Sequence, residues 1–126
     1  MFELEIGGHV YGFKFGIGFL REIDRAVKAG VPGLNGVEKP MGFRFYFSSF
    51  LDGDVQALEK ILLTGNAGMQ PRLTIPVLDE WVDDPDTDLD QVMADVKDFL
   101  LRSNACGGQA KRMIAEIQKE LEKAAK

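Results

Sequence analysis

The side chains best suited to catalysis, His9 and Cys106, each occur once in this chain of 126 residues. A cysteine–histidine nucleophile pair requires the two side chains to be in contact and a third group to orient the imidazole. His9 falls beside a predicted turn and Cys106 in a predicted break between helices, and no pattern links them. One histidine and one cysteine also cannot supply the four ligands of a structural zinc site. The sequence therefore predicts no catalytic residues, no metal, no cofactor and no enzymatic activity.

A glycine-containing segment at 16–21, Gly-Ile-Gly-Phe-Leu-Arg, follows a predicted strand and opens a predicted helix. Loops of this kind bind dinucleotides in parallel βαβ units. Here Arg21 occupies the third glycine position, where a side chain would obstruct close packing of helix on strand, and the preceding strand belongs to a hairpin. We interpret Gly16 and Gly18 as residues that let the chain turn from sheet into helix.

An acidic segment, residues 79–98, carries nine carboxylates and one lysine. Asp84, Asp86 and Asp88 alternate as calcium ligands do, but Leu89 stands where a calcium-binding loop requires glycine. Acidic side chains also gather at helix N-termini, where they satisfy backbone N–H groups and the helix dipole. The segment is therefore either a solvated helix start or a docking face for a basic partner.

The N-terminal residues predict a β-hairpin. Apolar and polar residues alternate over 2–6 and 9–14, and Gly7-Gly8 between them favours a two-residue turn. If Ile6 lies opposite His9, one face of the hairpin is apolar. This face consists of Phe2, Leu4, Ile6, Tyr11 and Phe13, whereas Glu3 and Glu5 lie on the other face. A lone hairpin is marginal in water, so this face must cover helices or another chain, and both edges are expected to be unpaired.

The remainder of the chain predicts about five or six helices. In the first, apolar residues recur at three and four positions, namely Ile17, Leu20, Ile23 and Val27. Residues 30–40, rich in glycine and proline, predict a loop. Asp54 and Thr74 are predicted N-caps of the third and fourth helices. Two further helices are expected after Asp88 and over about 109–124.

Residues 41–51 fit both a strand and a helix, and we favour a helix because Asp52-Gly53-Asp54 ends the segment and no partner strand is evident. Its aromatic side chains are too many for one buried stripe. Phe43, Phe47 and Phe50 are expected in the core. For Phe45 and Tyr46, core and partner-binding positions both remain open.

The predicted fold class is α+β, mostly α, with an N-terminal two-stranded β-hairpin packed on a bundle of about five or six helices. We expect a single domain over 1–126, comprising the hairpin (1–15), a helical body (16–105) and a projecting C-terminal helix (109–126). The formal charge of −5 argues against binding to nucleic acid. The N-terminus is no signal peptide, no apolar run could span a membrane, and the lone cysteine suits a reducing compartment, so a cytoplasmic location is expected.

Several segments together resemble the tail assembly chaperones of long-tailed phages that infect Gram-positive bacteria. They are residues 14–23 after the hairpin, 51–58 with its Gly-Asp step, 73–81, and the Asp-rich turn before a helix that ends in Ser103-Asn104-Ala105. The resemblance lies in the order and spacing of these segments and covers residues 1–106.

The resemblance implies a mostly helical, non-enzymatic protein that binds the tape-measure protein and helps recruit the tail-tube protein. Separately, the apolar hairpin face, the unpaired hairpin edges and the excess aromatics predict that the hairpin and residues 41–51 contribute to self-association or to contact with the tape-measure protein. The resemblance also implies action in the host bacterial cytoplasm, absence from the mature virion, and a longer form made by translational frameshifting. We expect no nucleic-acid or membrane partner. The alternative is an acidic, nucleic-acid-mimicking inhibitor or adaptor that binds a basic protein through the 79–98 face. The candidate protein-binding residues are Phe2, Leu4, Tyr11, Phe13, Phe45, Tyr46, Asp84, Asp86 and Asp88.

Overall fold

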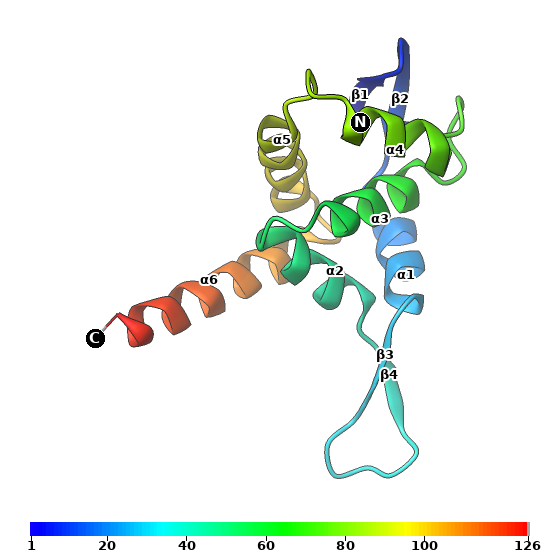
Figure 1. Ribbon diagram of the computed structural model, residues 1–126. Coiled ribbons are helices and arrows are strands. Elements are labelled where there is room, and N and C mark those ends of the chain that lie inside the picture. Colours follow the sequence, from blue (N-terminus) through cyan, green and yellow to red (C-terminus); the bar gives the residue numbers. More distant parts are fainter. Residues whose placement is uncertain (126) are drawn as a thin grey trace.

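A computed structural model describes residues 1–125 and shows an α+β fold that is mostly helical, with an N-terminal β-hairpin above a set of packed helices (Figure 1). The elements follow in the order β1 (Phe2–Ile6), β2 (His9–Phe13), α1 (Ile17–Arg25), β3 (Lys28–Gly30), β4 (Glu38–Pro40), α2 (Gly42–Leu51), α3 (Val55–Asn66), α4 (Ile75–Asp83), α5 (Leu89–Arg102) and α6 (Gly107–Ala124). The predicted fold class is confirmed.

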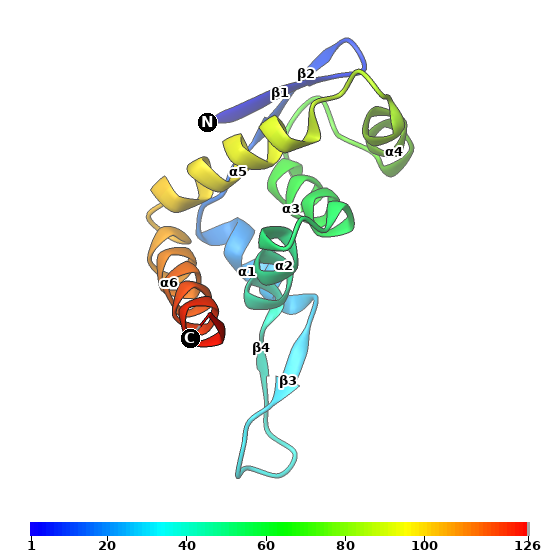
Figure 2. The ribbon, with the colours of Figure 1, turned by 60° about the vertical axis from the view of Figure 1, so that its left-hand side comes forward.

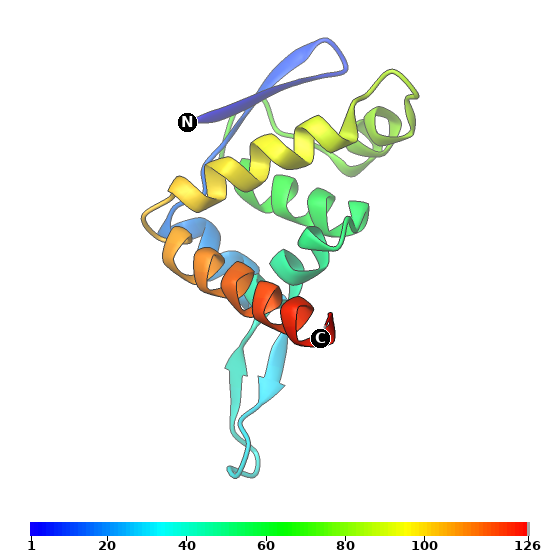
Figure 3. The same ribbon diagram turned by 90° about the vertical axis from the view of Figure 1, so that its left-hand side faces the viewer.

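The N-terminal hairpin has the predicted register. Ile6 lies opposite His9, and the antiparallel pairing continues to Phe2 opposite Phe13. Gly7 and Gly8 form the turn with φ of +60° and +84°, values that side chains other than glycine rarely adopt. The apolar face of the hairpin lies on α3, α4 and α5 (Figure 3), so the helices supply the cover that a lone hairpin needs.

A row of aromatic rings connects the hairpin to the helices. Phe15, just after β2, lies 5.0 Å from Phe19 of α1 between ring centroids. Phe19 lies 6.5 Å from Phe43 of α2, which stacks on Phe47 at 5.2 Å. These four rings are buried, and such ring pairs stabilise a core beyond their area alone. The core therefore runs continuously from the sheet through α1 into α2.

The predicted inward stripe of α1 is partly wrong. Ile23 is buried and Leu20 is half-buried as expected, but Ile17 is 62% exposed. Phe19 takes the inward position because its ring fits between Phe15 and the α2 aromatics. The helix also ends at Arg25, before Val27, since the chain there turns into β3.

Residues 41–51 are helical, as favoured. α2 starts at Gly42, whose backbone lies against the end of α1, and the Asp24 carboxylate of α1 accepts a hydrogen bond from the Phe43 N–H at 2.9 Å. Asp24 thus replaces the missing capping side chain at Met41. Phe43, Phe47 and Phe50 are buried, which confirms their expected place in the core.

The predicted loop at 30–40 is instead part of a second hairpin. β3 and β4 pair antiparallel, with Ala29 opposite Lys39, and they project from the end of the molecule opposite β1 and β2 (Figure 2). Three-residue strands are too short to show a clear alternation, so the glycine- and proline-rich composition dominated the prediction.

Asn66 connects the end of α3 to β2 and to the segment before α4 by hydrogen bonds. This fully buried side chain donates to the Gly12 and Pro71 carbonyls and accepts from the Leu73 N–H. Asp54 caps α3 through two backbone N–H groups, as predicted. Thr74 occupies the N-cap of α4 but its side chain makes no capping hydrogen bond, so that part of the prediction is wrong.

The turn between α5 and α6 is fastened to the strand end. The Ser103 hydroxyl donates to the Phe15 carbonyl and accepts from the Cys106 N–H. α6 then packs through Ala110 and Met113, and beyond them it continues with no fully buried residue among those described, past α2 (Figures 1 and 3).

Candidate protein-binding surfaces

The hairpin residues predicted to bind protein lie mostly inside the molecule. Tyr11 and Phe13 are buried, and Phe2 and Leu4 are half-buried against the core. The Phe2 ring lies 5.3 Å from Phe99 of α5 between centroids. In this conformation the four side chains attach the hairpin to the helices, and their role in binding stays a prediction.

Neither outer edge of the hairpin pairs with a strand within residues 1–125, as expected, but the edge of β2 is partly covered. The Gly12 carbonyl accepts from Asn66 and the Lys14 N–H donates to the Gly65 carbonyl at 2.8 Å, so the end of α3 covers part of the β2 edge. Within residues 1–125, no strand pairs with the outer edge of β1. Glu3 and Glu5 are exposed on this strand, and charges of this kind discourage pairing between edges.

An exposed apolar area lies on α2 and α6, and we call it the α2–α6 surface. Phe45 is 52% exposed beside a groove of about 450 Å³ that Val27 and Met41 also line. On α6, Leu121 is 64% exposed and lines a second groove with Ile117.

An ion pair joins the two halves of the α2–α6 surface. Arg44 Nη2 lies 2.9 Å from Glu116 Oε2, and each residue lines one of the two grooves. Both side chains are about half exposed, so the pair connects α2 and α6 but contributes little to stability.

Phe45 and Tyr46 have different environments. Tyr46 is half-buried, its ring lies 5.1 Å from that of Phe45, and the Lys60 ammonium of α3 lies 5.8 Å from its ring centroid. Phe45 points outward and Tyr46 is partly held by its neighbours. Of the two positions left open by the sequence, Phe45 is the accessible one.

Two of the three predicted aspartates at 84–88 stabilise local structure. Asp84 accepts from the Asp86 N–H in the turn, and Asp88 caps α5 by accepting from the Gln91 N–H. All three aspartates are exposed. Among the ion pairs of the described residues, one carboxylate of the 79–98 segment takes part, Asp98 with Arg102. Most of this charge faces solvent.

A groove separates the tip of the N-terminal hairpin from α4, and we call it the hairpin–α4 groove. It holds about 370 Å³, and its apolar lining is Tyr11, Val77 and Trp81. Glu80 and Asp84, both exposed, supply negative charge along it. The groove thus combines an apolar lining with an acidic rim.

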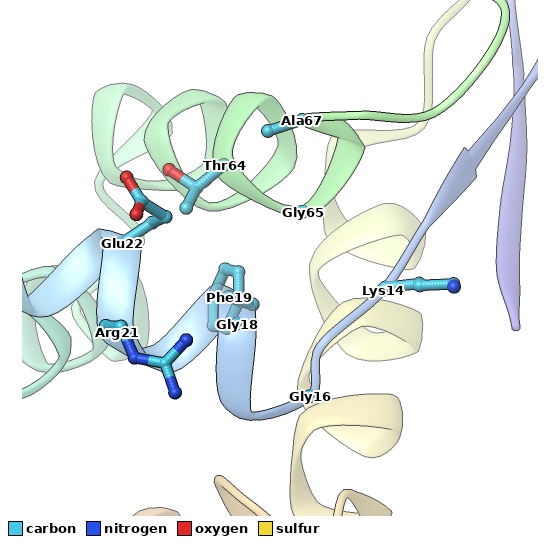
Figure 4. Close-up of a pocket in the computed structure, with 9 residues that line it drawn as sticks. All are labelled: Lys14, Gly16, Gly18, Phe19, Arg21, Glu22, Thr64, Gly65 and Ala67. Atoms are coloured by element: carbon cyan, nitrogen blue, oxygen red, sulfur yellow. The ribbon is translucent and has the colours of Figure 1, made fainter.

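The pocket at the glycine-containing segment is not built for a dinucleotide. It lies between the start of α1 and the end of α3, with a volume of about 320 Å³ (Figure 4). The Lys14 and Arg21 side chains point in different directions and do not converge on one point (Figure 4). The strand before the segment lies in an antiparallel pair, so the chain provides no parallel βαβ unit here.

His9 and Cys106 are not brought together. His9 is exposed at the hairpin–α4 groove, whereas Cys106 is buried at the start of α6 with its sulfur 3.7 Å from the Phe15 carbonyl oxygen. Burial raises the pKa of the Cys106 thiol to about 11. A thiol held in its protonated form is a poor nucleophile.

The pKa of one carboxyl group between α3 and α4, that of Glu59, is strongly raised. Burial, followed by a hydrogen bond with Asp79 and the charges of Asp79 and Asp83, raises the pKa of Glu59 to about 7.

Among residues 1–125, no group of three or more potential metal ligands is found. No helix in the same range is long and apolar enough to cross a bilayer.

The described residues therefore offer exposed apolar surfaces that suit binding to another protein. A family model described as phage tail assembly chaperone protein, TAC, matches residues 3–123. The chain belongs to this family. The resemblance seen in the sequence is thereby confirmed and extends into α6. Neither the curated proteins nor the solved structures contain a match.

Membership in a family of chaperones indicates a role other than catalysis, in assembly rather than as a part of the virion. Sequence reasoning missed two surfaces of this chaperone, the tip of the β3–β4 hairpin and the hairpin–α4 groove. Val31, Leu34 and Val37 between glycines were the available signal for the tip. The groove left none, since its lining comes from segments far apart in the chain.

Proposed function

We propose that this chaperone binds the tape-measure protein and assists assembly of the tail tube around it. Family membership over residues 3–123 is the observation that carries the proposal. The α2–α6 surface supports it, because a long helical client with apolar stripes needs apolar surface to cover it. Phe45 and Leu121 offer such surface, each more than half exposed.

Co-expression with the tape-measure protein tests the proposal. The affinity-tagged chaperone should retain the tape-measure protein, and replacing Phe45 and Leu121 by serine should weaken binding about tenfold, or about 1.4 kcal/mol. The matched control is Ile75→Ser, which removes a side chain that is 57% exposed on α4, outside the α2–α6 surface. Equal retention by the double variant and the control would contradict a role for this surface, and no retention by the wild type would contradict the proposed client.

Salt separates the proposal from an acidic inhibitor or adaptor that binds through 79–98. Contacts between apolar surfaces persist at high ionic strength, whereas a charged face that mimics nucleic acid loses its partner as salt screens it. We expect the complex with the tape-measure protein to survive 1 M salt, at which the screening length is about 3 Å. Release at that ionic strength would favour the acidic-face alternative.

A further inference from the structure

The β3–β4 hairpin forms an arm with an apolar tip. We define the arm as residues 28–40. Its strands pair with each other, and the tip extends away from the helices (Figure 1). Leu34 and Val37 are 55% and 46% exposed there. A two-stranded hairpin without cover is marginal in water, so an arm with an apolar tip is suited to burial on a partner.

The tip holds a defined shape of its own. Val31 donates to the Val37 carbonyl at 2.9 Å, and Leu34 donates to the Val31 carbonyl at 3.1 Å. Gly33 and Gly36 have φ of +81° and +74°, which lets the chain reverse at both positions. The backbone of the tip is thus held in one arrangement, which lowers the backbone entropy lost on binding.

We propose that the arm of one chaperone molecule docks in the hairpin–α4 groove of a second copy. Leu34 and Val37 would contact the apolar lining formed by Tyr11, Val77 and Trp81. Two residues beyond Val37, the exposed Lys39 would approach the Glu80 and Asp84 rim. Glu38, also exposed, lies on the opposite face of β4 from Val37 and Lys39, because side chains alternate along a strand. The apolar tip and Lys39 therefore complement the apolar lining and the acidic rim, and Lys39, Glu80 and Asp84 form no ion pair within the described chain.

The positions of arm and groove determine the kind of assembly. They lie at opposite ends of the molecule, so an arm cannot enter the groove of its own chain (Figures 1 and 2). The contact is heterologous: each copy uses its arm on one neighbour and its groove on another. Such contacts generate open chains, or rings if the rotation closes. The inference stands whether or not the client is a tape-measure protein.

Mixing two defective variants tests this geometry. The arm variant carries Leu34→Asp and Val37→Asp, and the groove variant carries Glu80→Lys and Asp84→Lys; all four positions are exposed. By sedimentation velocity, the wild type should form species that grow with concentration, and each variant alone should be monomeric. An equimolar mixture should give a dimer and nothing larger, because one functional arm and one functional groove remain.

The matched control reverses the same number of charges elsewhere. Glu3→Lys with Glu5→Lys changes the exposed face of β1 and should assemble as the wild type does. If the Asp84 replacement disturbs the turn it stabilises, shown by a lower urea midpoint, Glu80→Lys alone makes the same test.

Several results would overturn the proposal. They are a wild type that stays monomeric up to about 1 mM, variants that assemble normally, a mixture that stays monomeric, or loss of assembly in the β1 control. An arm needed for tape-measure binding in a wild type that is monomeric on its own would assign the arm to the client instead.

Discussion

At Gly42 the backbone of α2 meets the backbone of α1, and no side chain fits between them. A Cβ atom there would lie 1.6 Å from the Ile23 carbonyl oxygen and 2.9 Å from the Asp24 Cα. Gly42→Ala must therefore separate the two helices, and we expect the free energy of unfolding to fall by about 3 kcal/mol. Urea denaturation measures this loss. Gly18→Ala is the control: Gly18 lies inside α1 without a positive φ, so the interpretation that it is needed for the turn from sheet into helix is wrong. A Cβ there meets nothing within 4 Å, and alanine should stabilise the protein by about 0.5–1 kcal/mol.

Asn66 supports three backbone groups at once, and its amide is needed as a donor as well as an acceptor. Asn66→Asp keeps the acceptor for the Leu73 N–H but places a carboxylate against the Gly12 and Pro71 carbonyls. The buried Gly12 carbonyl and the partly buried Pro71 carbonyl then lack this donor, and we expect a loss of about 2–4 kcal/mol in the free energy of unfolding. Asn104→Asp, at an exposed position, should leave the urea midpoint nearly unchanged. Similar urea midpoints for the two variants would show that the Asn66 hydrogen bonds do not stabilise the fold.

At the level of elements, local sequence patterns were sufficient to predict a strand or helix where the residues that determine it are neighbours in sequence. The Gly7-Gly8 turn and the alternation on either side of it determine the β1–β2 register. Asp54 indicates the start of α3 because it caps that helix. β3 and β4 could not be recognised this way, because three residues carry too little pattern. The prediction that Ile17 is buried was wrong for another reason. Phe19 takes the inward position because it contacts the aromatic side chains of α2, which are distant in sequence.

The candidate surfaces were less predictable than the elements. The sequence left Phe45 open between core and surface, since periodicity does not say which side of an aromatic-rich helix faces its neighbours. The hairpin–α4 groove requires β1–β2 and α4 to be placed side by side, which no local pattern encodes. The capping role of Asp88 was recognisable because capping is a local interaction, whereas binding of a partner by Asp84, Asp86 and Asp88 stays a prediction.

The contact between α3 and α4 makes stability depend on pH through Glu59. Its folded-state pKa of about 7 exceeds the ordinary value of 4.5, so between these values the folded protein binds more protons than the unfolded chain. The contribution of Glu59 to stability is therefore fully present below pH 4.5 and is lost as the pH rises through 7. Glu59→Gln should raise the urea midpoint at pH 8 and flatten its dependence on pH. Asp79→Asn removes the partner but not the burial, and should flatten the dependence less; an unchanged slope in both variants would exclude Glu59 as its source.

On the scale of the whole molecule, stability and binding are assigned to different parts. The core joins the N-terminal hairpin to α1, α2, α3, α5, one face of α4 and the first half of α6. The projecting arm, the second half of α6 and the acidic turn before α5 surround it and contribute few buried side chains. Parts that do not support the core are free to contact other molecules, which suits a protein that must bind during assembly.

Shortening α6 tests this division, because the last fully buried residue of the helix is Met113. A chain ending at residue 117 retains Met113 and Glu116 and loses exposed groups, so its free energy of unfolding should change by less than about 1 kcal/mol. A chain ending at residue 108 also loses Ala110 and Met113, exposes the α5–α6 contact, and should lose several kcal/mol, about 2–5 for the methionine alone. Because Leu121 belongs to the α2–α6 surface, the chain ending at residue 117 should remain folded by circular dichroism and urea denaturation yet retain less tape-measure protein. Unfolding of that product would assign the end of α6 to the core, and full retention would place the client on other parts of the molecule.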